Sequence, residues 1–177
     1  MAATAHHRRS WKGNTMGTTT LIAEPGIPTL EMTRDFDAPP ALVFRAYTDP
    51  DLVARWMGPR RLRTEIVEWD LRHGGSWRYI SHDPDGGRYA FRGVFHGTPS
   101  EDAMVQTWEF EGYPGSVQLQ KARFEDLGGR TRVHASVTFF SLAERDGLVA
   151  SGMEGGMNEG YARLDELLAE LSQLSQP

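Results

Sequence analysis

The C-terminal part of the chain carries a long helical pattern, from about Asp146 to Leu174. Within it, apolar residues such as Val149, Met153 and Met157 recur at roughly 100° per residue, and charged or amide residues fall opposite them. At roughly 1.5 Å per residue, the pattern predicts one amphipathic helix about 40 Å long, enough to lie across a small sheet. The apolar face of this helix needs a partner to cover it.

Two glycines, Gly156 and Gly160, fall on the apolar side of this helix, where a packed core normally places Leu or Ile. Glycine in a helix costs about 1 kcal/mol relative to alanine, so these positions need an explanation. One interpretation is that the helix leaves a space beneath Met153 to Tyr161. The other is that glycine lets the backbone of a sheet approach closely. The sequence leaves both interpretations open.

The middle of the chain shows a different pattern, in which apolar and polar residues alternate. Such alternation is typical of half-buried strands. Short connections rich in Gly, Pro and Asp separate the segments, so consecutive segments are expected to pair as antiparallel hairpins. Six strands are predicted here, over residues 62–71, 76–81, 88–98, 103–111, 117–125 and 130–140.

One further strand and two short helices precede these six strands. Alternation over Thr29–Phe36 predicts the strand, and Asp37 is expected to cap a helix that has two prolines in its first turn. A second short helix is expected over Asp51–Met57, ended by Gly58. The predicted fold class is therefore α+β: a seven-stranded curved antiparallel sheet, with two short helices after the first strand and a long C-terminal helix packed over the sheet.

The alternation also predicts which side chains face the long helix, because successive side chains of a strand point to opposite sides. In the last strand, the inward positions are Val133, Ala135, Val137 and Phe139. The same rule gives the sheet an aromatic inner surface with two polar exceptions, Gln106 and Arg34. The aromatic members of this surface are Trp77, Tyr79, Phe91, Phe95 and Trp108.

Composition narrows the class of protein. The chain has 177 residues, 39% of them hydrophobic, which is enough for a single core, and residues 1–28 show no periodicity. We therefore expect a flexible N-terminal arm over 1–28 and one domain over 29–174. No apolar run approaches the ~18 residues of a membrane span, so no membrane partner is expected. The lack of cysteine favours a cytoplasmic location, and the net charge of −5 argues against a nucleic-acid partner.

Four local sequences stand out: RDFDAPPALVFRAYTDPDLVARWMGP from Arg34, DLRHGGSWRY from Asp70, FRGVF from Phe91 and GMNEGYARLDELLAEL from Gly156. In this order and spacing they resemble the SRPBCC superfamily, whose fold is also called START-like or helix-grip. Within it, the chain is similar to the family of activator of heat-shock protein 90 ATPase homologue-like proteins. The resemblance covers nearly everything from Thr29 to Leu171.

The resemblance implies that the sheet grips the C-terminal helix and that a hydrophobic cavity lies between them. In relatives such a cavity holds apolar or amphipathic small molecules, and in a minority it carries out catalysis. We therefore expect a ligand-binding protein, linked to the stress response, whose partner is a small apolar or aromatic molecule. A chaperone ATPase regulator or protein-interaction module is an alternative, although residues 1–28 are too few for the separate N-terminal domain of the eukaryotic co-chaperones. A homodimer is compatible with both a ligand-binding protein and a protein-interaction module.

The residues expected to line this cavity come from the second short helix, the inner face of the sheet and the long helix. Ligand sites are mostly apolar with a few polar groups, and Gln106 and Tyr161 are the candidates for the polar role. Each aromatic residue could instead fill an ordinary core. The full set is Trp56, Trp77, Tyr79, Phe91, Phe95, Gln106, Trp108, Met153, Gly156, Met157, Gly160 and Tyr161.

The sequence gives no catalytic or metal-binding constellation. Asp83 and Asp85 begin like a calcium loop, but Val94 occupies the position where such a loop needs a bidentate Glu, so we predict an ordinary turn. No histidine pair has zinc-ligand spacing. No cofactor and no catalytic residue are therefore predicted, and the sequence favours a binding protein over an enzyme. The enzyme alternative is a cyclase or hydratase that acts through the shape of its cavity, with Gln106 or Tyr161 as a hydrogen-bond donor.

Overall fold

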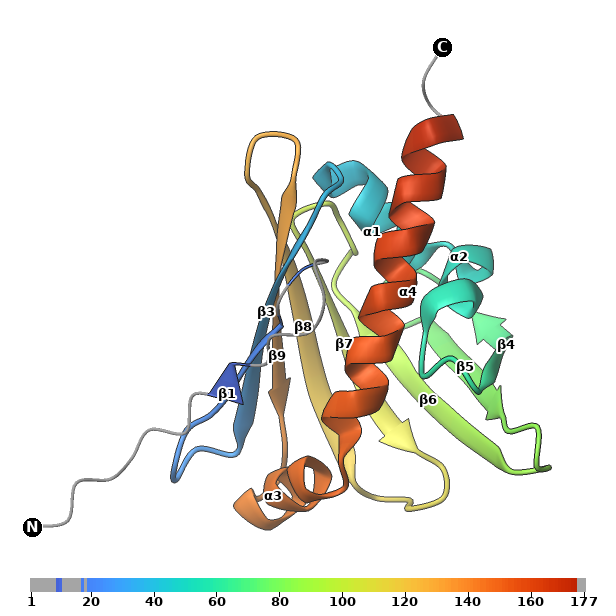
Figure 1. The fold of residues 1–177 in the computed structure, drawn as a ribbon. Coiled ribbons are helices and arrows are strands. Elements are labelled where there is room, and N and C mark those ends of the chain that lie inside the picture. The colour runs from blue at the N-terminus through green and yellow to red at the C-terminus, as the bar shows by residue number, and fades with distance from the viewer. Residues whose placement is uncertain (1–8, 11–16, 18, 175–177) are drawn as a thin grey trace, which may run out of the picture.

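The structure, a computed structural model, describes residues 9–10, 17 and 19–174 (Figure 1). Its strands are β1 (Arg9–Ser10), β2 (Thr20–Ala23), β3 (Thr29–Phe36), β4 (Arg63–Trp69), β5 (Ser76–His82), β6 (Arg88–His96), β7 (Ala103–Phe110), β8 (Val117–Asp126) and β9 (Thr131–Thr138). Its helices are α1 (Pro40–Thr48), α2 (Pro50–Trp56), α3 (Leu142–Ala150) and α4 (Met153–Leu174). The α+β class is confirmed, and the seven predicted strands are present with ends within two residues of those predicted.

All the strands form one antiparallel sheet in the order β1-β2-β3-β9-β8-β7-β6-β5-β4. Within the described residues the sheet has nine strands, eight of them at least four residues long, so the prediction of seven was too low. The additional strands are β1 and β2, which come from the predicted arm. β2 pairs with β3 because its Leu21 is buried with Leu30 and Val137 in a small apolar cluster. The rest of the predicted arm, residues 1–8, 11–16 and 18, lies outside the described residues.

The predicted single C-terminal helix is two helices. α3 ends at Ala150, and α4 begins at Met153, after Gly152 takes a φ of +79°. This backbone conformation ends a helix and favours glycine. Because of the break, Val149 does not lie on the inner face as predicted but is 39% exposed. The long helix itself has 22 residues, about 33 Å.

The start of α1 also differs from the prediction. Asp37 does not cap this helix; Pro39 occupies the cap position without a side-chain hydrogen bond. Asp37 lies outside the helix and pairs instead with Arg130, at 2.6 Å. At the start of α2, the side chain of Asp49 accepts a hydrogen bond from the backbone N–H of Asp51.

α4 lies across the concave face of the sheet, with α1 and α2 beside it and α3 at the end where α4 begins (Figure 1). Its C-terminal half is tightly packed, since Leu164, Leu167 and Leu168 are at most 3% exposed. The predicted inward positions of β9 are confirmed, because Val133, Val137 and Phe139 are buried. No helix in the described part of the chain has the length and apolar character to cross a membrane.

Candidate functional site

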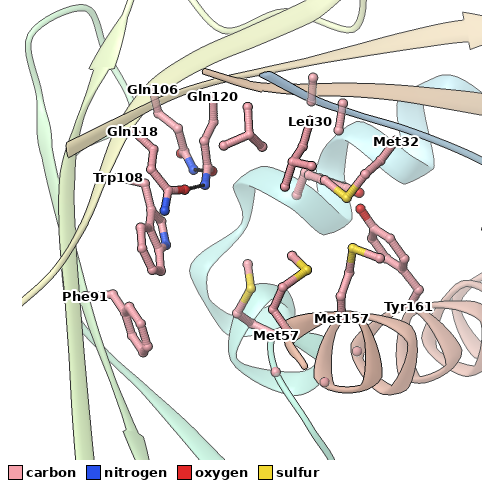
Figure 2. Close-up of a pocket in the computed structure, with 18 of the residues that line it drawn as sticks. Leu30, Met32, Met57, Phe91, Gln106, Trp108, Gln118, Gln120, Met157 and Tyr161 are labelled. Carbon is pink, nitrogen blue, oxygen red and sulfur yellow. Dashed lines mark hydrogen bonds between the residues drawn. The ribbon is translucent and has the colours of Figure 1, made fainter. Parts of the chain in front are cut away.

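A cavity of about 450 Å³ lies between the first half of α4 and the concave face of the sheet (Figure 2). Its walls come from strands β3–β9, from α1, α2 and the loop after α2, and from α3 and α4. Voids in packed protein interiors are few and mostly no larger than a water molecule, whereas ligand pockets measure about 300–1,000 Å³. The size of the cavity therefore fits a binding site and not a packing defect.

Gly156 and Gly160 both line the cavity. Of the two interpretations, close backbone approach applies at Gly160 and unfilled space applies at Gly156. A side chain begun at Gly160 would lie 3.2 Å from the backbone oxygen of Trp56, so this glycine permits a close approach, by the loop after α2 and not by the sheet. At Gly156 the nearest neighbour is the Pro59 ring, 3.7 Å from the position of an added Cβ. A side chain can therefore begin at Gly156, and its outer atoms would occupy space that is now empty.

The structure brings together nearly all the candidate residues. The cavity wall includes Trp56, Trp77, Tyr79, Phe91, Gln106, Trp108, Met153, Gly156, Met157, Gly160 and Tyr161. Phe95 lies outside this wall: it is fully buried, and its ring packs edge-on against Trp69 with 5.3 Å between the centroids. That the wall residues contact a ligand stays a prediction.

Four aromatic rings form a continuous band along the sheet side of the cavity. Trp77 stacks on Tyr79 with 5.6 Å between centroids, Tyr79 lies 4.9 Å from Phe91, and Phe91 lies 5.0 Å from Trp108. The indole N–H of Trp108 points to the hydroxyl oxygen of Tyr79 at 3.5 Å. Burial raises the pKa of Tyr79 to about 12, so its phenol is neutral at physiological pH.

Trp56 is another wall residue, and α1 holds it in place. The Trp56 indole N–H donates to the backbone oxygen of Ala46 at 2.8 Å, and its ring stacks on Tyr161 with an interplanar angle of 20°. Burial also raises the pKa values of Tyr47 and Tyr161, and the nearby Tyr161 adds to the rise at Tyr47. Both phenols are therefore neutral groups that can share or donate a hydrogen bond but cannot act as a base at pH 7.

Three glutamines on the cavity wall form a connected group, which we call the glutamine row: Gln106, Gln118 and Gln120 (Figure 2). Gln106 and Gln120 are direct partners across β7 and β8. The amide nitrogen of Gln106 donates to the oxygen of Gln120 at 3.1 Å, and the nitrogen of Gln120 donates to the oxygen of Gln118 at 3.3 Å. Gln118 is only 6% exposed.

Gln106 was predicted from the sequence as a cavity residue, whereas Gln118 and Gln120 were not. In β8, apolar Val117 and Leu119 alternate with these glutamines, which suggests that the glutamines face outward. The structure has the opposite arrangement, since Leu119 is 48% exposed. The signal that would have found them lies further along β8, because buried Phe124 has the same parity as both glutamines and the pairing shows no shift in register.

The remaining lining is flexible and apolar. Met32, Met57 and Met157 lie across the cavity from Phe91 and Trp108 (Figure 2), and Met153 also lines the wall. Lys121 contributes to the wall from an exposed position of β8, on the parity opposite to the glutamine row. Within the described residues, the wall includes no His, Asp or Glu.

The predicted turn at Asp83 is confirmed. The Asp83 side chain accepts from the backbone N–H of Asp85 at 3.0 Å, and the Asp83 carboxylate pairs with Arg61. No group of three His, Asp or Glu side chains in the described part of the chain could hold a metal ion.

Comparison with solved structures places this fold among bacterial proteins. A crystal structure from Mycobacterium smegmatis has a TM-score of 0.76 and 24% identity, covering 84% of this chain and 94% of the other. A crystal structure from Rhodobacter sphaeroides has a TM-score of 0.79 and 23% identity, and the match covers 86% of this chain and 99% of the other. A solution structure from Arthrobacter aurescens has a TM-score of 0.78 and 25% identity, and the match covers 85% of this chain and 91% of the other. A search of curated protein sequences finds no match.

A family model gives the more specific result. The model described as activator of Hsp90 ATPase homolog 1-like protein matches residues 37–169. This range runs from the residue after β3 to the last turns of α4, so it includes both short helices, the meander of strands and the helix that covers the cavity. The chain therefore belongs to the family of activator of Hsp90 ATPase homolog 1-like proteins.

Proposed function

We propose that the protein binds a small apolar or amphipathic molecule in the cavity beneath α4. The observation that carries this proposal is the unfilled volume of about 450 Å³, lined by a band of aromatic rings on one side and methionines on the other. Burial of apolar surface stabilises a complex by about 25 cal/mol per Å², so a ligand that fills such a space gains affinity without any charged contact. Methionine side chains adapt to ligands of different outline.

The lining supports binding more than catalysis. The cavity wall has three tyrosines, whose pKa values burial raises, so none of these phenols is ionised at pH 7, and its one charged residue, Lys121, is exposed. A general base would need a His, Asp or Glu within reach of the substrate, and the described cavity wall has none. The cyclase or hydratase alternative has no specific observation in its favour. A chaperone partner, a homodimer, a role in the stress response and a cytoplasmic location stay predictions.

The experiment is a binding titration with the neutral fluorescent probe N-phenyl-1-naphthylamine on three proteins: the wild type, Gly156→Leu and Gly155→Leu. Gly156 faces the cavity, and a leucine there places its branched end in the space the ligand needs. Gly155 is the next residue of the same helix, is exposed, and has nothing within 4 Å of an added Cβ. Both variants raise the helix propensity equally.

We expect Gly156→Leu to weaken probe binding by about tenfold or more, equivalent to about 1.4 kcal/mol, and Gly155→Leu to bind like the wild type. Native mass spectrometry of freshly purified wild-type protein should show a bound mass that Gly156→Leu lacks. Equal affinity of all three proteins for the probe would show that the cavity is not the binding site.

A further inference from the structure

The glutamine row is an unusual feature of an otherwise apolar cavity. Three primary amides lie side by side on the concave face, at positions where the neighbouring strands place aromatic and aliphatic side chains. Buried amides cost free energy unless they are hydrogen-bonded, so an apolar cavity without a polar occupant gives no reason for them. We propose that the cavity selects a neutral ligand whose carbonyl-type oxygen accepts hydrogen bonds from this row. This inference rests on the proposed function and specifies its ligand class.

The hydrogen bonds within the row show which of its donors and acceptors have no partner there. Each carboxamide has two N–H donors and one oxygen. The internal bonds use one N–H of Gln106 and one of Gln120, and they engage the oxygens of Gln120 and Gln118. The amide nitrogen of Gln118 donates to none of the described residues in this arrangement. Turning all three amides over reverses the direction of the row but still leaves N–H groups that it does not use.

Unused donors determine what a partner must supply. In this arrangement four N–H groups of the row are unused, one each on Gln106 and Gln120 and two on Gln118, whereas only one oxygen, that of Gln106, accepts no bond within the row. The group that completes the row is therefore a hydrogen-bond acceptor. Figure 2 shows Gln118 beside the ring of Trp108, at the end of the aromatic band, so the acceptor oxygen belongs next to a ring of the ligand that stacks on this band.

The acceptor is neutral because, among the described residues, the cavity wall has one cationic residue, Lys121, and it does not share the face of the row. Arg34 is not part of the cavity wall and is engaged with Asp165 at 2.5 Å. Lys121 is exposed on the opposite parity of β8. A carboxylate or sulfonate would lose its hydration on entering and would gain only neutral amide donors, whereas a ketone, lactone or amide oxygen loses less water and gains the same bonds.

Three fluorescent probes of similar naphthalene body test this chemistry. 6-Propionyl-2-(dimethylamino)naphthalene is a neutral aryl ketone whose emission moves to longer wavelength when its carbonyl accepts a hydrogen bond. N-phenyl-1-naphthylamine is neutral and has no carbonyl, and 1-anilinonaphthalene-8-sulfonate is its anionic counterpart. We would titrate each into the wild type, into the triple variant Gln106→Leu/Gln118→Leu/Gln120→Leu, and into Gln173→Leu as a control. Gln173 is an exposed glutamine on α4.

The triple variant leaves no orphaned amide, so replacing the whole row by apolar groups of similar size is compatible with folding. We expect it to bind the ketone roughly five- to tenfold more weakly than the wild type, with emission at shorter wavelength, and to bind N-phenyl-1-naphthylamine at least as tightly. That second titration also shows that the variant keeps its cavity. The control should match the wild type with every probe.

The outcomes separate the two proposals. If the triple variant binds the ketone with unchanged affinity and unchanged emission while both proteins bind N-phenyl-1-naphthylamine, the row is not an acceptor site, although the cavity still binds ligands. Tighter wild-type binding of the sulfonate than of N-phenyl-1-naphthylamine would overturn the neutral-ligand class. If the wild type binds none of the probes, the proposed function fails and this inference fails with it.

Discussion

Gly93 lies in β6 beneath the indole ring of Trp77. A Cβ built at Gly93 would come within 2.6 Å of that ring and would also collide with the backbone oxygen of Thr107. The missing side chain is what lets Trp77 lie flat against the sheet and stack on Tyr79. The aromatic band of the cavity therefore depends on a residue that contributes no side chain to it.

Gly93→Ala tests this dependence. Because neither the backbone of β7 nor a fully packed indole can move freely, the substitution should lower the free energy of unfolding by about 1–3 kcal/mol, the usual range for overpacking. Urea denaturation followed by circular dichroism measures it. Gly155→Ala is the control, since this exposed helical glycine has open space around it and alanine should stabilise it by up to about 1 kcal/mol. A neutral Gly93→Ala would mean that Trp77 does not need this gap.

Individual cavity residues could be predicted from sequence where alternation was unambiguous. On β5, β6 and β7 the aromatic residues mark the inner face, and eleven of the twelve candidates do line the cavity. Phe95 has the correct parity, but the position of the cavity along the strand depends on where α4 crosses, which no local pattern contains. Gln118 and Gln120 were missed because hydropathy treats a buried amide as an outward residue, and only the three-dimensional cavity explains why amides face inward here.

At the scale of elements, the break between α3 and α4 decides where the cavity is covered. α3 is tied to the end of the sheet, because Arg145 donates to the backbone oxygens of Glu24 and Ile27 and Ser116 donates to Glu144 at 3.2 Å. α4 takes a new direction after Gly152 and crosses the concave face (Figure 1). The sequence did not reveal this break, since Gly152 is one of several glycines in a continuous helical pattern and helix propensity does not distinguish among them.

A glycine at this break and a glycine within α3 should respond in opposite directions. Gly152 has a φ of +79°, so Gly152→Ala should destabilise the protein by about 1–2 kcal/mol, the cost of placing an L-residue in the left-handed region. Gly147 lies within α3, is exposed and has nothing within 4 Å of an added Cβ, so Gly147→Ala should stabilise by up to about 1 kcal/mol. Thermal unfolding of the two variants measures both changes. Stabilisation by both would indicate a continuous helix in solution.

At the scale of the whole molecule, Arg34 joins three parts that are distant in sequence. From β3 it donates to the backbone oxygen of Gly17 at 2.6 Å, to the Thr19 hydroxyl at 2.9 Å and to Asp165 of α4 at 2.5 Å. Burial raises the pKa of Asp165 and Arg34 opposes that rise, so the ionised carboxylate depends on this arginine. The pair fixes α4 over the sheet next to the cavity, because the Arg34 guanidinium also lies 5.5 Å from the ring centroid of the wall residue Tyr161.

Two carboxylates of α4 allow a matched comparison of buried and exposed ion pairs. Asp165 meets Arg34 at 2.5 Å with side chains 9% and 6% exposed, whereas Glu170 meets Arg55 at 2.5 Å with both side chains near half exposed. We expect Asp165→Asn to lower the free energy of unfolding by about 3 kcal/mol, because it leaves a buried guanidinium without its counter-charge. Glu170→Gln should cost less than about 1 kcal/mol. Guanidinium denaturation would measure both, and equal effects would contradict the role given to the buried pair.

The overall architecture was largely predictable, because the change from alternating to helical periodicity and the hairpin turns fix the meander and its covering helix. The N-terminal strand β2 could not be predicted, because a strand of four residues is too short to show periodicity. Its place depends on pairing with β3 and on burial of Leu21. The cavity itself was suggested by Gly156 and Gly160 but could not be established from them, because one of the two serves close packing against the loop after α2.

The placement of the tryptophans around the cavity makes their intrinsic fluorescence a direct signal of ligand binding. The cavity is lined by four tryptophans from α2, β4, β5 and β7, which are Trp56, Trp69, Trp77 and Trp108. Any occupant that absorbs in the near ultraviolet would lie within energy-transfer range of every one of them. Loading and release could therefore be followed in the unlabelled molecule by the loss and return of its intrinsic emission.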